Sequence, residues 1–269
     1  MEILVIYGVI FGFVYFLGVT IKKALTSKAH KYHPQTKGEL KALVDNPAIN
    51  LGEIDTSKIT DMSYLFANSM RQDFSGIEDW DVSNVTNMAG MFGRLESFIH
   101  LGAKSSFNQN INNWNVSNVT TMGAMFAGAK FFNQPLDKWN VSNVTDMGKM
   151  LYKAESFNQP LENWDVSNVT TMEAMFCRAE SFNRNINAWS VRSVTNMGGM
   201  FCEAYSFNQP LKDWNVSSVT NMRSMFYKAE SFNQPLNKWD VDKVTNMEEM
   251  FEGSPTKLPV WYDNVILFP

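Results

Sequence analysis

Few residues in this chain have types and spacing suited to chemistry. Three histidines (His30, His33 and His100) cannot supply the clustered ligands of a zinc or iron site. No histidine recurs near a serine or cysteine, and no phosphate-cradling glycine loop is present. The sequence therefore predicts no catalytic residue, no cofactor, no metal and no enzyme activity.

Two cysteines, Cys177 and Cys202, are too few for a disulfide framework, but they are 25 residues apart. They occupy the same position in adjacent repeat units, so a bond between them is conceivable in an oxidising compartment. Other units place Ala, Tyr or Glu at this position, and we expect it to lie on outer helices too far apart for a bond. Free thiols are therefore the favoured interpretation.

Composition excludes several classes of protein. The 269 residues contain 45% hydrophobic side chains, enough for a sizeable core. With 23 basic and 27 acidic residues the net charge is −4, which is not the footprint of a nucleic-acid binder. The sequence therefore predicts a folded protein with no nucleic-acid partner and no small-molecule substrate.

Any functional site in this chain must be positioned by its repeated sequence units. Tryptophans recur with a 25-residue period, which indicates a repeat array. A nine-residue insertion lengthens one early unit, and a degenerate unit opens the array, so we expect eight units. They begin at residues 54, 80, 114, 139, 164, 189, 214 and 239.

Within each unit the spacing of apolar residues changes once, from strict alternation to a helical spacing. Trp139 and Val141 alternate with polar residues, which predicts a short parallel strand. Farther on, apolar residues fall at i, i+3, i+4 and i+7, which predicts a short helix with Thr145 as its N-cap. That helical face consists of Met147, Met150, Leu151 and Ala154. The fold class expected is an α/β solenoid with one strand and one helix per unit.

An asparagine recurs directly after a phenylalanine in successive units. Asn side chains at turns can bond neighbouring backbone, and buried amides must be paired. We therefore expect a structural Asn ladder rather than a ligand site. Its members are Asn133, Asn158, Asn183, Asn208 and Asn233.

The repeat motif resembles a known family. The segments WDVSNVTNMAGMF (80–92) and FNQPLENWDVSNVTTMEAMF (157–176) are similar to BspA-like leucine-rich repeat surface proteins of bacteria. The resemblance covers residues 52–254. It implies a leucine-rich-repeat stack and a cell-surface family in which some members adhere to host proteins, and it brings no catalytic residues.

The two ends of the chain depart from the repeat. Residues 32–52 contain a capping box at Thr36 and Glu39, which predicts an amphipathic helix covering the first repeat. Residues 255–269 include Trp261 and are expected to cover the other end. The expected divisions are an anchor with basic flank (1–31), an N-terminal cap (32–52), the array (53–254) and a C-terminal cap (255–269).

The segment Ile3–Ile21 predicts a transmembrane helix, because nineteen nearly uncharged residues give a helix of about 28 Å. Lysines follow it, so the positive-inside rule predicts a single-pass protein with its repeats facing the cytoplasm. Display at the cell surface is the alternative, as is cleavage of the segment.

In each predicted strand one residue points outward between two residues that point inward. We call the row of these outward residues the Asp/Asn stripe. With the inserted loop, which carries His100 and Lys104, this stripe is the predicted contact surface for a protein partner. The alternative is a passive spacer that binds nothing specific. The stripe consists of Asp81, Asn115, Asn140, Asp165, Ser190, Asn215 and Asp240.

Overall fold

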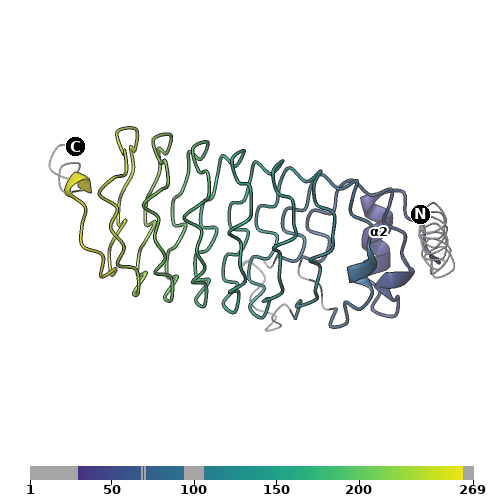
Figure 1. Cartoon of the computed structure of the whole chain (residues 1–269). Coiled ribbons are helices and arrows are strands. Elements are labelled where there is room, and N and C mark those ends of the chain that lie inside the picture. Colours follow the sequence, from purple (N-terminus) through teal and green to yellow (C-terminus); the bar gives the residue numbers. More distant parts are fainter. Residues whose placement is uncertain (1–29, 68, 70, 94–105, 263–269) are drawn as a thin grey trace, which may run out of the picture.

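The computed structural model describes residues 30–262 except 68, 70 and 94–105. Coils of chain, one per repeat unit, stack side by side from the helix α2 at one end to the last coil at the other (Figure 1). The elements are α2 (Lys37–Val44) and two 3₁₀ helices, η1 (Leu51–Glu53) and η2 (Ile77–Asp79). The described chain ends in a helical turn at 260–262.

The prediction of an α/β leucine-rich-repeat solenoid is wrong in its elements. Within the described residues the coils contain no regular strand, only isolated parallel bridges between successive coils, and no helix in the region of Met147–Ala154. Seven of these bridges form one chain from Asp61 to Asn246, so they link eight coils. We call its members the bridge column: Asp61, Asn87, Thr121, Asp146, Thr171, Asn196, Asn221 and Asn246.

Hydrogen bonding between coils explains why the predicted helix does not form. The amides of Met147, Lys149, Leu151 and Lys153 donate to carbonyls of the next coil at 2.7 to 3.2 Å, instead of to the carbonyl four residues earlier. The intervening amides close tight turns within the coil, such as Met150 N–H to the Met147 carbonyl (3.1 Å). Every second peptide group therefore joins two coils.

This alternation requires left-handed backbone. Lys149 and Lys153 have φ of 58° and 56°, a region that a right-handed helix never uses. Their counterparts in other units share it, among them Gly90 and Gly199 in one column and Gly128 in the other. The residues predicted as a helical face are nevertheless all buried, because the turns also point them inward.

The Thr predicted as an N-cap bonds across coils instead. Thr145 donates its backbone N–H (2.8 Å) and its hydroxyl (3.2 Å) to the carbonyl of Thr120 in the preceding coil. This contact recurs along the array, so the repeated Thr is a rung between coils.

The core is continuous along the stack. Trp139, Val141 and their counterparts are buried, and the predicted alternation with exposed residues is confirmed. Trp164 and Trp189 stack with ring centroids 6.4 Å apart and nearly parallel planes, as aligned units require. Each indole also donates to a carbonyl of the preceding unit, for example from Trp164 Nε1 to Leu136 (3.0 Å).

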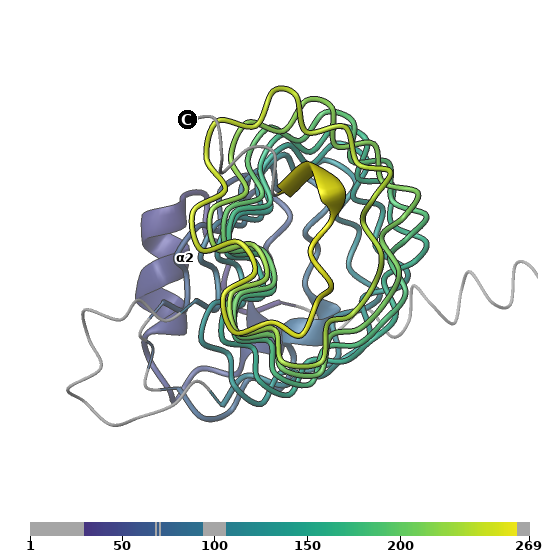
Figure 2. The ribbon, with the colours of Figure 1, turned by 90° about the vertical axis from the view of Figure 1, so that its left-hand side faces the viewer.

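The N-terminal helix forms as the capping box predicts. The Thr36 hydroxyl accepts from the Glu39 amide at 3.2 Å, and Glu39 accepts from the Gln35 amide. Its Leu40 and Val44 are fully buried in the core cluster. Viewed along the stack, α2 lies on the side where the coils are indented (Figure 2).

The membrane prediction is contradicted. No helix in residues 30–262, apart from the undescribed positions, has the length and apolar character needed to cross a bilayer. This finding overturns the single-pass placement with cytoplasm-facing repeats. The segment Ile3–Ile21 itself lies outside the described residues.

Candidate functional site

The Asp/Asn stripe is exposed along the whole stack, as the alternation predicts. Its carboxylate and carboxamide groups, however, are engaged in local turns. Asp165 accepts from the Ser167 amide at 3.0 Å, and Asn140 accepts from the Ser142 amide at 3.1 Å. The same bond occurs at Asp81, Asn115, Asn215 and Asp240. The repetition of Asp or Asn is therefore explained by an Asx turn.

One unit departs from this turn. Ser190 stands where the other units have Asp or Asn, and Arg192 stands where six units have Ser. Among the described residues Ser190 does not make this bond, because a shorter hydroxyl side chain stands in place of the carboxylate or carboxamide. The stripe is interrupted at this point.

A hollow of about 520 Å³ lies at this interruption. We call it the Ser190 hollow. It is open to solvent, and Ala188 takes the position at which the neighbouring units carry the longer polar side chains of Asn163 and Asp213. Its lining comprises Asn185, Asn187, Ala188, Trp189, Ser190, Val191, Arg192, Asp213 and Asn215.

Opposite charges meet around the Ser190 hollow. Hydrogen bonds from Ser167 hold the pKa of Asp165 below its usual value, and the nearby Arg192 guanidinium adds to this effect. On the other side, Lys212 and Asn187 hold the pKa of Asp213 below its usual value. Asn187 and Asp213 also bond across the two coils, with Asp213 N–H donating to Asn187 Oδ1 at 3.1 Å. The hollow is therefore lined by an exposed guanidinium and an ionised carboxylate, with the Asp165 carboxylate near Arg192.

A second groove, of about 320 Å³, follows the bridge column. Its floor includes Gly123 and Gly148, and its rim includes Lys149 and a half-exposed Tyr64. The predicted helix would have covered this surface, which is why sequence reasoning missed it. Glycines at 123, 148 and 198, all two residues after the bridge column, are the signal that could have indicated it.

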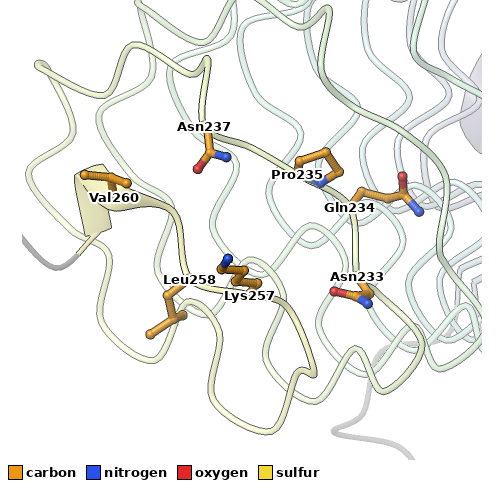
Figure 3. A pocket seen from close by; sticks show the side chains of 7 residues that line it. All are labelled: Asn233, Gln234, Pro235, Asn237, Lys257, Leu258 and Val260. Carbon is orange, nitrogen blue, oxygen red and sulfur yellow. The ribbon is translucent and has the colours of Figure 1, made fainter.

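A third hollow lies at the end of the stack. Figure 3 shows its two walls: the segment from Asn233 to Asn237 in the last coil, and the tail from Lys257 to Val260. Asn233 ends the described Asn ladder, donating its amide N–H to Asn208 Oδ1 at 3.0 Å. The same bond joins Asn158 to Asn133, so the predicted structural ladder is confirmed. This end hollow is thus a consequence of where the stack stops.

The C-terminal tail continues the tryptophan file. Trp261 stacks on Trp239 with centroids 6.5 Å apart and donates to the Leu236 carbonyl at 2.9 Å. Trp261 therefore packs on the last tryptophan of the array, whereas residues 263–269 of the predicted cap lie outside the described residues. The other predicted contact residues, His100 and Lys104, lie outside the described residues.

The two cysteines are free in the structure, Cys177 buried and Cys202 half-buried. The reason given against their pairing was wrong, because this column is not on separate helices. It lies on adjacent coils that are hydrogen-bonded to each other.

Comparison with known proteins found one relationship. Comparisons with curated proteins and with solved structures gave no match. A family model described as "Mycoplasma protein of unknown function, DUF285" matches three tandem segments, residues 39–101, 100–170 and 158–259. These segments run from within α2 through the coils and cover well over half of the sequence. The chain belongs to the DUF285 repeat family.

Proposed function

We propose that this protein is a protein-binding scaffold that holds its partner at the Ser190 hollow. The observation that carries the proposal is the local departure from the repeat at Ser190 and Arg192, which coincides with a hollow on an otherwise regular face.

Stacking does not require these two residues. The units at Asp165 and Asn215 form the same coil with an Asx turn, and their backbone bonds match those of the unit between them. A unit that lacks the turn gives up a hydrogen bond worth about 1 kcal/mol. Contact with something outside the stack therefore explains why this unit carries Ser190 and Arg192.

The chemistry of the hollow favours a protein segment. Most of its lining residues are polar and it is open to solvent, whereas small-molecule sites are mostly apolar and bury most of their ligand. Arg192 is exposed and lies near Asp165, and within the described part of the chain no hydrogen bond holds its guanidinium, so its planar face is available for two parallel bonds to a carboxylate. Arginine is also enriched among residues that dominate binding energy at protein interfaces.

The sequence resemblance supports the same role. Repeats of this chain are similar to those of BspA-like proteins, for which adhesion to proteins is described in some members. Extended surfaces of stacked repeats commonly serve as binding faces.

The test restores the repeat at this one unit. The double variant Ser190→Asp/Arg192→Ser creates the Asp-Val-Ser motif of the unit at 165–167, so it should fold at least as stably as the wild type. Both proteins serve as baits in quantitative capture from an extract, and each protein enriched by the wild type is purified and titrated directly. We expect one direct partner whose affinity falls about 30-fold or more, as for loss of a binding hot spot.

A matched control changes the same face by the same charge. Lys138→Asn/Asn140→Asp converts its unit to the residues found at Asn163 and Asp165, and like the test variant it makes the chain more negative by two charges. It should leave the affinity unchanged. Equal affinity of all three proteins would contradict the site, and no direct partner at all would favour the passive spacer.

A further inference from the structure

Cys177 and Cys202 lie side by side on two adjacent coils. The Cys177 carbonyl accepts from the Lys153 amide at 2.8 Å, and the Cys202 carbonyl accepts from the Arg178 amide at 2.8 Å, so three successive coils are bonded in register here. Chains bonded in this way lie about 4.8 Å apart. That separation is within the Cα range of about 4.4 to 6.8 Å that a disulfide requires.

The two thiols differ in exposure and acidity. Cys177 is 8% exposed, whereas Cys202 is only half-buried. Because the Cys177 thiol hydrogen-bonds to the Cys202 sulfur, the pKa of Cys202 is lowered and that of Cys177 is raised. The positive charges of Arg178 and Lys228 lower the pKa of Cys202 further, against burial and Glu203. Cys202 is thus the accessible thiol that ionises first.

The repeat does not require cysteine at this column. Equivalent positions carry Ala127, Tyr152 and Tyr227, and these residues fit the same turn. Two consecutive cysteines, in the only two units that have one, are therefore not explained by packing.

We propose that Cys177 and Cys202 are a redox pair that closes into a disulfide between coils when the chain meets a small-molecule disulfide such as oxidised glutathione. The bond encloses the segment that carries Ser190 and Arg192.

The reaction balances in two exchanges. The Cys202 thiolate attacks one sulfur of oxidised glutathione, which forms a mixed disulfide and releases one glutathione thiolate. Cys177 then loses its proton to solvent and attacks Cys202 Sγ, which breaks the mixed disulfide and releases the second glutathione. Two electrons pass from the cysteine pair to the oxidant, which leaves as two reduced glutathione molecules.

The experiment follows the full chain through oxidation. Reduced protein is freed of reductant, incubated with oxidised glutathione, quenched in acid and measured by intact mass and by non-reducing peptide mapping. We expect the loss of two hydrogen atoms, a cross-linked peptide pair containing Cys177 and Cys202, and no retained glutathione. Thermal unfolding of the oxidised monomer should shift upward by about 5 to 10 °C and return on reduction.

Alanine variants test the order of attack. Alanine already occupies this column at Ala127, so both variants should fold. Cys177→Ala should accumulate a stable glutathione adduct on Cys202, whereas Cys202→Ala should react at least ten-fold more slowly. A wild-type protein that keeps two free thiols, retains glutathione, or forms only cross-links between chains would overturn the proposal, as would equal reactivity of the two variants.

Discussion

Each recurring polar residue in this protein makes a bond that joins or closes the coils. Trp Nε1 and Thr Oγ1 donate to carbonyls of the preceding coil, and the stripe Asp or Asn closes a turn within its own coil. The recurring polar residues that look like candidate binding sites therefore have structural roles. Ser190 and Arg192 stand out at this scale because they break a pattern whose structural purpose is known.

The Asx turn at Asp165 should make stability depend on pH. Bonds from Ser167 lower the folded pKa of Asp165 below the unfolded value, so its contribution is full above about pH 4 and is lost as pH falls through the folded pKa. Asn140 makes the same turn without titrating. Asp165→Asn should therefore lose less stability than the wild type between pH 5 and pH 2, measured by urea unfolding at each pH. An equal loss in both proteins would show that the turn does not set this dependence.

At the scale of elements, the coil replaces both the strand and the helix that the periodicity predicts. Burial follows the sequence faithfully: Trp139, Val141, Met147 and Met150 are all inside. Apolar spacing reports which side chains point inward, and a chain of alternating left- and right-handed turns satisfies the same spacing as a helix. Glycines at 90, 128, 199 and 253 were the local signal against a helix, since each lies at positive φ.

The left-handed column gives a pair of opposite predictions. Gly199 has φ of 64°, and a Cβ added there would lie no closer than 3.8 Å to another atom. Gly199→Ala therefore tests the backbone conformation without a steric clash. It should cost about 1 kcal/mol of unfolding free energy. Ala174 has φ of 51° in the same column, and Ala174→Gly should gain about 0.5 kcal/mol after the entropy of glycine is deducted. Chemical denaturation measures the change in unfolding free energy of both variants. Changes of the same sign would contradict the left-handed backbone described for this column.

Besides the buried Leu40 and Val44, a buried arginine bonds the end of α2 and the segment after it to the stack. Arg71 donates to the carbonyls of Val44, Asn46 and Ile49, and burial lowers its pKa. Arg71→Ala leaves these carbonyls without donors and should cost about 3 kcal/mol or more. Hydrogen exchange should show faster exchange in residues 37–44.

The matched control is Arg223→Ala, which removes an exposed ion pair with Glu248. That change should cost about 0 to 1 kcal/mol and leave exchange in α2 unchanged. Equal costs for the two variants would show that Arg71 does not secure the helix.

The stack behaves as a one-dimensional array, because the bonds between coils in the described residues join successive coils. The order of the units and the alignment of the tryptophans followed from the 25-residue period. The period did not predict the Ser190 hollow, because the hollow depends on side-chain size in two adjacent coils, at Ala188 and at Asp213.

Removing one complete unit should preserve the fold. Deleting residues 115–139 joins Trp114 to Asn140 in register, so the deletion variant should unfold cooperatively at a lower temperature and bind the partner as the wild type does. Deleting only residues 115–126 breaks the register and should give an aggregated or unfolded chain. Circular dichroism and thermal unfolding distinguish the two deletions, and equal tolerance of both would contradict stacking by register.

The most direct test of the central claim is the affinity of the captured partner for Ser190→Asp/Arg192→Ser relative to the wild type, measured by calorimetry beside Lys138→Asn/Asn140→Asp. A loss of about 30-fold confined to the first variant, with both variants as stable as the wild type, is the predicted result. Unchanged affinity of the first variant, or equal losses in both, would contradict a binding site at the Ser190 hollow.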